Sequence, residues 1–290
     1  MGLGAGSNFP RWENLMSVEW LAANDAAEGA VEMHAAAGMA LTGLEKARLF
    51  REIEMDIAVG ATELRARHVG WVRKWPELGK LSIGRDKSTL LLLAARFDCA
   101  KIVEELLATG CCNARAVDDD GYSALMFAAL AREEDVGERV ARALIPHCSL
   151  SSWNPKRGPG GAGDVSLAIS EGNLKIAKML ADARGGAAVS KEGPIWRDAF
   201  GQNWLHFALM SQKPEAALDW ALSLPSARIM FDAQNNAGQT PWQMALSRAQ
   251  RHPEAVEKLL AARANWERDD LLLATPISEG RSSGKPRARL

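Results

Sequence analysis

The sequence predicts an all-α fold in which short helical hairpins stack into a solenoid, preceded by a helical capping segment. The main observation is a repeat. The stretch at 198–208, Asp-Ala-Phe-Gly-Gln-Asn-Trp-Leu-His-Phe-Ala, recurs in similar form at 118–129 and 235–245, and weaker copies stand at 89–95 and 165–169. Successive copies are 34 to 40 residues apart, measured between the aligned positions Lys87, Gly121, Gly161, Gly201 and Gly238. Such a spacing is typical of repeat proteins.

Each copy begins with residues that favour a tight turn followed by a helix. Asp198 stands three residues before Gly201, so its side chain can bond nearby backbone while the glycine takes a left-handed conformation. Thr240 then offers a helix N-cap, and Pro241 fits the first helical position. Small residues follow, as expected where neighbouring first helices lie close together: Ala94, Ala95, Ala128, Ala129, Ala168, Ala208 and Ala245. An aligned apolar column is interpreted as core: Leu93, Phe127, Leu167, Phe207 and Met244.

The second helix of each unit shows a single apolar stripe. Apolar residues fall at i, i+1 and i+4 in 102–107, 176–180 and 256–260, which is the pattern of an amphipathic helix with one buried face. Gly110 follows the first of these segments, where a left-handed C-terminal cap is expected. One turn and two helices per unit therefore account for residues 85–268.

This pattern resembles the ankyrin repeat family, whose units run Asp-x-x-Gly-x-Thr-Pro-Leu-His-x-Ala-Ala before a second helix. The matching residues of the fourth and fifth units are Asp198, Gly201, Leu205, His206, Ala208, Gly238, Thr240, Pro241 and Ala245. The chain departs from the pattern where Asn203 and Trp204 replace Thr-Pro, and where the third unit begins in the glycine-rich loop 154–163. The resemblance implies that the ring of His206 bonds backbone near the turn. It also implies a protein partner in the groove formed by the turns and first helices.

Residues 1–84 lack the repeat pattern and are expected to be helical at 12–23, 44–59 and 62–75, with Pro76 stopping the last helix. The simplest role for this segment is to cover the apolar face of the first unit. The alternative is a small helical domain that binds its own partner through tryptophans. Those side chains are Trp12, Trp20, Trp71 and Trp75.

Residues 269–290 are basic and rich in Gly and Ser, which predicts a disordered tail. Over the whole chain, 35 basic and 36 acidic residues give a formal net charge of -1, which argues against a general nucleic-acid binder. No apolar run approaches the roughly 18 residues that span a membrane, and the first residues lack the parts of a signal peptide. We therefore expect a cytoplasmic protein without membrane partners, or one in the host-cell cytosol if it is a secreted effector.

The sequence shows no catalytic or metal-binding motif: neither a phosphate loop, nor a nucleophile elbow, nor HExxH is present. The cysteines have no CxxC spacing, and Cys99 is interpreted as a small packed residue. A metal site joining Cys111 and Cys112 to His147 and Cys148 is a minor alternative. The acidic run at 118–120 lacks the further ligands of a calcium loop. We expect no catalytic residue, cofactor, metal or small-molecule substrate.

The leading functional hypothesis is a protein-binding module that acts as a scaffold, adaptor or inhibitor. Two alternatives remain: a regulator or effector of bacterial or phage origin that blocks a specific enzyme, and an enzyme with its active site in residues 1–84. The candidate partner-binding residues are Asp119, Asp120, Tyr122, Trp196, Phe200, Gln202, Asn236 and Gln239 in the turns, and Arg96, Arg132, Met210 and Arg248 on the first helices. Aromatic residues often anchor interfaces, so Tyr122, Trp196 and Phe200 come first. Internal packing of Trp196 and Phe200 is the alternative.

Overall fold

The computed structural model describes residues 42–59, 62–82, 88–148, 162–184 and 197–274. In these ranges the chain is helical, and β-structure is confined to two isolated bridges, Ser82 to Thr89 and Val117 to Ser123. The predicted all-α class is therefore confirmed.

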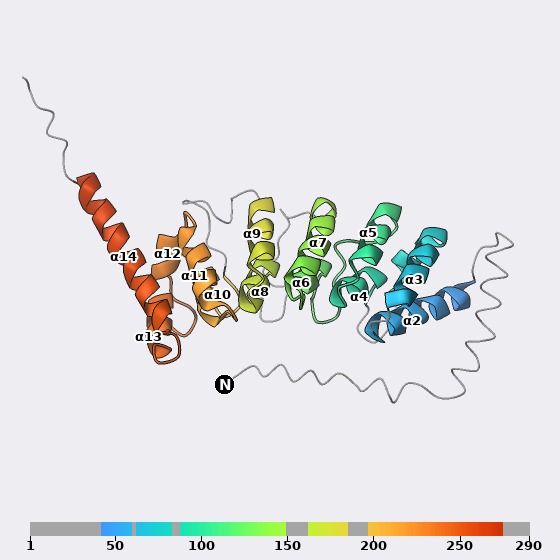
Figure 1. Ribbon diagram of the computed structural model, residues 1–290, viewed down its shortest axis with the longest axis horizontal. Coiled ribbons are helices and arrows are strands. Elements are labelled where there is room, and N and C mark those ends of the chain that lie inside the picture. Colours follow the sequence, from blue (N-terminus) through green and yellow to red (C-terminus); the bar gives the residue numbers. More distant parts are fainter. Residues whose placement is uncertain (1–41, 60–61, 83–87, 149–161, 185–196, 275–290) are drawn as a thin grey trace, which may run out of the picture.

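Most helices lie in two rows (Figure 1). Helices of the first row each contact the next member: α4 (Leu90–Arg96), α6 (Ala124–Ala129), α8 (Asp164–Glu171), α10 (Trp204–Met210) and α13 (Pro241–Ser247). Each of these contacts the helix that follows it in the second row: α5 (Ala100–Thr109), α7 (Glu134–Leu144), α9 (Leu174–Ala183), α11 (Pro214–Ser223) and α14 (Pro253–Ala274). Short connecting helices are η3 (Ile145–His147) and α12 (Ala227–Asp232).

The hydrophobic core runs between the two rows. All seven alanines at the predicted small positions of the first row are buried. Their size lets neighbouring first helices approach closely, because interaxial distance depends on the side chains at the contact. Cys99 is buried as well, as expected of a small packed residue.

Carbonyl groups at the ends of the first helices are bonded by side chains of the following unit. Asn173 Nδ2 donates to the carbonyls of Ala129 and Ala131, both at 2.9 Å. Ser211 Oγ donates to the carbonyl of Ile169 at 2.5 Å. The last carbonyls of a helix have no partner within it, so these bonds satisfy orphan acceptors and fix the register between units.

At one end of the rows, α2 (Gly43–Val59) and α3 (Thr62–Lys74) confirm two of the helices expected in residues 1–84, and η2 (Pro76–Lys80) follows. Helix α2 contacts α4, and α3 contacts α5, so this segment packs on the first unit. Trp75 is buried and Trp71 is half-buried against the core, which places both within the fold rather than on a free surface. The helix expected at 12–23 lies outside the described residues.

His68 belongs to the interior of this N-terminal segment. It is fully buried, its Nε2 lies 3.0 Å from Asp56 Oδ2, and its ring is 5.2 Å from that of Trp71.

At the other end the sequence-based prediction needs two corrections. Helix α12 was not expected; it buries Met230 and Phe231. Helix α14 continues past 268 to Ala274, so residues 269–274 are helical rather than part of a tail. The C-terminal half of α14 contacts α12: Trp266 packs edge-on against Phe231, and Asp270 pairs with Arg228.

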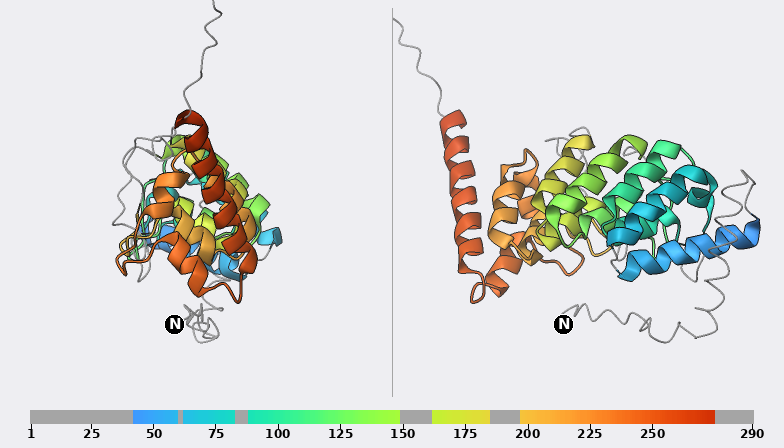
Figure 2. Two further views of the ribbon diagram at one scale, coloured as in Figure 1. Left: turned by 90° about the vertical axis from the view of Figure 1, so that its left-hand side faces the viewer. Right: turned by 45° about the vertical axis from the view of Figure 1, so that its right-hand side comes forward.

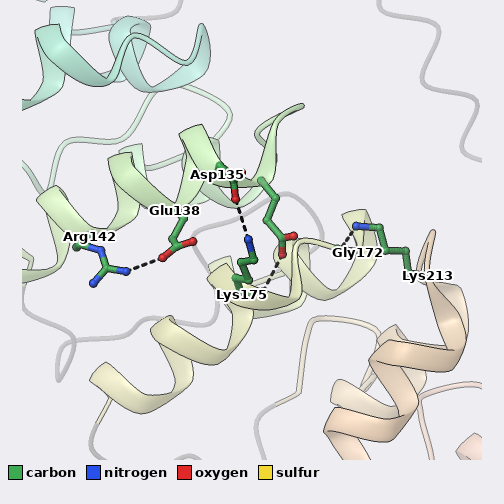
Figure 3. A network of polar contacts seen from close by, with 7 residues as sticks. Asp135, Glu138, Arg142, Gly172, Lys175 and Lys213 are labelled. Carbon is green, nitrogen blue, oxygen red and sulfur yellow. Dashed lines mark hydrogen bonds and ion pairs between the residues drawn. The ribbon is translucent and has the colours of Figure 1, made fainter.

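Ion pairs join successive helices of the second row. Arg139 of α7 forms two bonds of 2.6 Å to Glu104 of α5, and Lys175 Nζ of α9 lies 2.7 Å from Asp135 Oδ1 of α7. The pairing with Lys175 lowers the pKa of Asp135. Figure 3 shows the pair of Lys175 with Asp135, the pair of Arg142 with Glu138, and the bond from Lys213 to Gly172. These pairs are exposed, so they add little to stability. They do mean that several charged side chains of the second row already have a partner on a neighbouring helix.

Candidate functional site

Three turns of one design precede helices of the first row. In the turn at 198–202, Asp198 Oδ1 accepts from the N–H groups of Phe200 at 2.9 Å and Gln202 at 2.7 Å. The N–H of Gly201 donates to the carbonyl of Asp198 at 3.1 Å, and the glycine has φ of 75°. The same bonds recur at 118–122 and 235–239. The Asp or Asn and the glycine therefore act as the sequence predicts.

The turns at 198–202 and 235–239 lie against each other. The N–H of Asn236 donates to the carbonyl of Phe200, and its Nδ2 donates to that of Ala199, both at 2.8 Å. Arg197 Nη1 donates to the carbonyl of Gln234 at 3.0 Å. Asn236 was expected to bind a partner, but its amide joins two turns. Arg197 was not expected, and only its position directly before the turn could have suggested it.

The ring of His206 also links these two parts of the chain, through bonds to the backbone of Asn203 and Gln239. Its Nδ1 accepts from the N–H of Asn203 at 3.2 Å, and its Nε2 donates to the carbonyl of Gln239 at 3.0 Å. Burial lowers the pKa of this histidine, so the ring is held neutral. The structural role that the family resemblance implies for His206 is confirmed. The side chain of Gln239 itself is exposed.

The ring of Tyr122 stacks on that of Phe127 in helix α6. The two ring centroids lie 5.2 Å apart, at an interplanar angle of 18°. The guanidinium of Arg96 lies 5.7 Å from the Phe127 ring and 5.9 Å from the Phe97 ring. Burial, with the nearby charge of Asp118, raises the pKa of Tyr122, so the phenol is neutral. Two predicted residues, Arg96 and Tyr122, thus share one aromatic cluster.

Phe200 is the large apolar side chain that the turns expose most clearly, at 60%. Asp119, Asp120 and Arg132 are exposed, whereas Gln202 is half-buried. These positions agree with the expected surface, and the alternative that Phe200 packs internally is wrong. Trp196 lies outside the described residues.

Two of the predicted first-helix residues are engaged within the fold. Met210 is half-buried and packs against the core. Arg248 Nη1 donates to the carbonyl of Leu209 at 3.0 Å, in the same manner as the other bonds between units. Of the predicted residues, Arg96 and Tyr122 are half-buried, and the exposed ones are Asp119, Asp120, Arg132, Phe200, Asn236 and Gln239.

Of the cysteines, Cys112 lines a hollow of about 350 Å³, together with His147. Cys112 Sγ donates to the carbonyl of Leu106 at 3.2 Å, and Cys148 Sγ to that of Ala114 at 3.5 Å. Burial raises the pKa of Cys148 to about 11 and raises that of Cys112 as well. Neutral thiols are poor metal ligands and poor nucleophiles. Among the described residues, no cluster of three or more His, Cys, Asp or Glu side chains is placed to hold a metal ion.

No protein-family model matches the chain, and no curated protein matches it. In the described part of the chain, no helix has the length and apolar character needed to cross a membrane.

Proposed function

We propose that this protein is an ankyrin-type solenoid that binds a protein partner on the surface formed by its turns and first helices. The ankyrin type is supported by the form of the unit. A hydrogen-bonded turn with a left-handed glycine leads into a short first helix and a longer second helix, whereas other helical repeats of similar length lack the turn.

The observation that carries the proposal is the exposed Phe200, on one of three turns of the same design. Its side chain is 60% exposed on a turn fixed by hydrogen bonds. Tyr122, which is half-buried, stands on another of these turns, and both it and Arg96 lie against the ring of Phe127. Tyr and Arg are enriched among the residues that dominate binding energy. Rigid turns lose little conformational freedom on binding, which favours affinity.

The second row offers less for a partner. Many of its charged groups already pair with neighbouring helices, as Lys175 does with Asp135. In the proposed role, the protein acts as a scaffold, adaptor or inhibitor. Blocking a specific enzyme is one form of the same binding activity.

The test is affinity capture from the native cell, with co-eluting proteins identified by mass spectrometry. Tyr122→Ala combined with Phe200→Ala should remove the specific partner, because two such anchors together contribute on the order of 4 kcal/mol. The matched control is Arg142→Ala combined with Lys178→Ala, two exposed residues of the second row. Equal capture by both variants, with unchanged helical circular dichroism, would exclude the turn surface.

A further inference from the structure

Helices α13 and α14 form one end of the rows, and no other described helix lies on their outer side (Figures 1 and 2). The repeat allows a direct comparison with an internal unit. Leu209 of α10 is 4% exposed, while Leu246 at the matching position of α13 is 49% exposed. The last unit keeps the apolar residue type that elsewhere packs on a following unit.

The second helix of this unit shows the same difference. Leu107 of α5 is 7% exposed, whereas Leu260 at the matching position of α14 is 50% exposed. Leu246 and Leu260 therefore belong to an uncovered stacking face, which we call the end face.

The outer side of α14 has opposite charges at its two ends. Ala255, Leu259 and Trp266 face the fold, which places the exposed residues on the other side of the helix. Those residues, at helical spacing, are Glu257, Leu260, Ala261, Ala264 and Arg268. Within the described part of the chain, Glu257 and Arg268 make no ion pair, while nearby Arg263 and Asp270 are paired.

We propose that the end face binds the same face of a second copy of this chain, with the two α14 helices antiparallel. In that arrangement Glu257 of each copy lies opposite Arg268 of the other, and Ala261 lies opposite Ala264. A two-fold interface needs such a self-complementary pattern. The side chains at the centre are small, so the helices can approach closely and bring Leu260 and Leu246 into the contact.

The test measures the oligomeric state of the full chain by sedimentation equilibrium. The wild-type protein should dimerise, and Leu246→Glu combined with Leu260→Glu should leave monomers. Glu257→Arg alone, or Arg268→Glu alone, should weaken the dimer about tenfold or more, because each places two pairs of like charges together. Lys101→Glu and Glu215→Arg, exposed charges on α5 and α11, should have no effect.

The decisive measurement mixes the two single charge variants. Glu257→Arg protein and Arg268→Glu protein should form a heterodimer of wild-type affinity, and the double variant should regain the homodimer. A wild-type chain that stays monomeric at about 100 μM would overturn the proposal, with residues 275–290 or another protein as the remaining occupants. A dimer that both single variants and their mixture leave unchanged would overturn it too. These residues lie away from the turns, so partner capture should persist in all variants.

Discussion

The contact between the turns at 198–202 and 235–239 can be measured with two glycine substitutions. Gly201 and Gly238 occupy the same position of matching turns, and both have φ of 75°. An added Cβ at Gly238 has no neighbour within 4 Å, whereas at Gly201 it would lie 2.5 Å from Asn236 Oδ1 and 2.9 Å from Asn236 N. The pair therefore separates the cost of the left-handed backbone from the cost of the contact.

The backbone term is the same at both sites. An alanine in the left-handed region destabilises the folded state by about 1–2 kcal/mol. The alanine also reduces the conformational entropy of the unfolded chain, which stabilises the folded state by about 0.4–1 kcal/mol. We expect Gly238→Ala to lower the free energy of unfolding by about 1 kcal/mol. Gly201→Ala should cost about 2–3 kcal/mol more, because it overlaps Asn236 and disturbs that residue's hydrogen bonds.

Urea unfolding followed by circular dichroism gives both free energies, with the slope showing whether the unfolded states are comparable. Equal destabilisation by the two substitutions would mean that the turns at 198–202 and 235–239 do not touch, contrary to the structure.

Two further predictions concern buried polar groups. In the fifth unit, Gln243 holds the position that His206 holds in the fourth, and its side chain takes part in the cap of α13. The substitution His206→Gln should lower the melting temperature most near pH 7.5. Burial lowers the pKa of His206, so its neutral ring stabilises the fold above its ordinary pKa of about 6.5, and this stability is lost as pH falls through the lowered pKa. Thermal melts between about pH 7.5 and 5 should show the gap between wild type and variant closing, and a constant gap would contradict this. Asn173→Ala should lower the free energy of unfolding in urea by about 2–3 kcal/mol, because it leaves two buried carbonyls without their donor. Asn113→Ala, on an exposed local turn, should lower it by less than about 1 kcal/mol. Similar losses in the two variants would show that the bonds between units do not stabilise the fold.

The local elements of the fold were predictable because short stretches of sequence determine them. Asp198 and Gly201 form the expected turn, and Thr240 with Pro241 starts α13 with the expected cap. The buried alanines follow from the repeat itself, since each unit repeats the same packing problem.

Elements held by distant contacts were not predictable in the same way. Helix α12 has six residues, too few to form alone, and a bond from Asn203 Nδ2 to the carbonyl of Met230 at 2.8 Å helps to hold it. In the last turns of α14, Trp266 packs against Phe231 and Asp270 pairs with Arg228, and both partners belong to α12.

The candidate site shows the same limit. Periodicity placed Arg248 and Asn236 on the exposed side of their units, but it does not reveal which carbonyl lies within reach in the preceding unit. Both side chains bond a neighbour 37 to 39 residues away. The side chain of Phe200 is 60% exposed, so the expectation from its turn position holds.

The most direct test of the proposed binding surface is hydrogen exchange of the protein with and without its captured partner. We expect slower exchange at 119–122 and 200–202, and no change in α7 or α9 of the second row. Protection confined to α7 and α9, with the turns unaffected, would contradict this expectation.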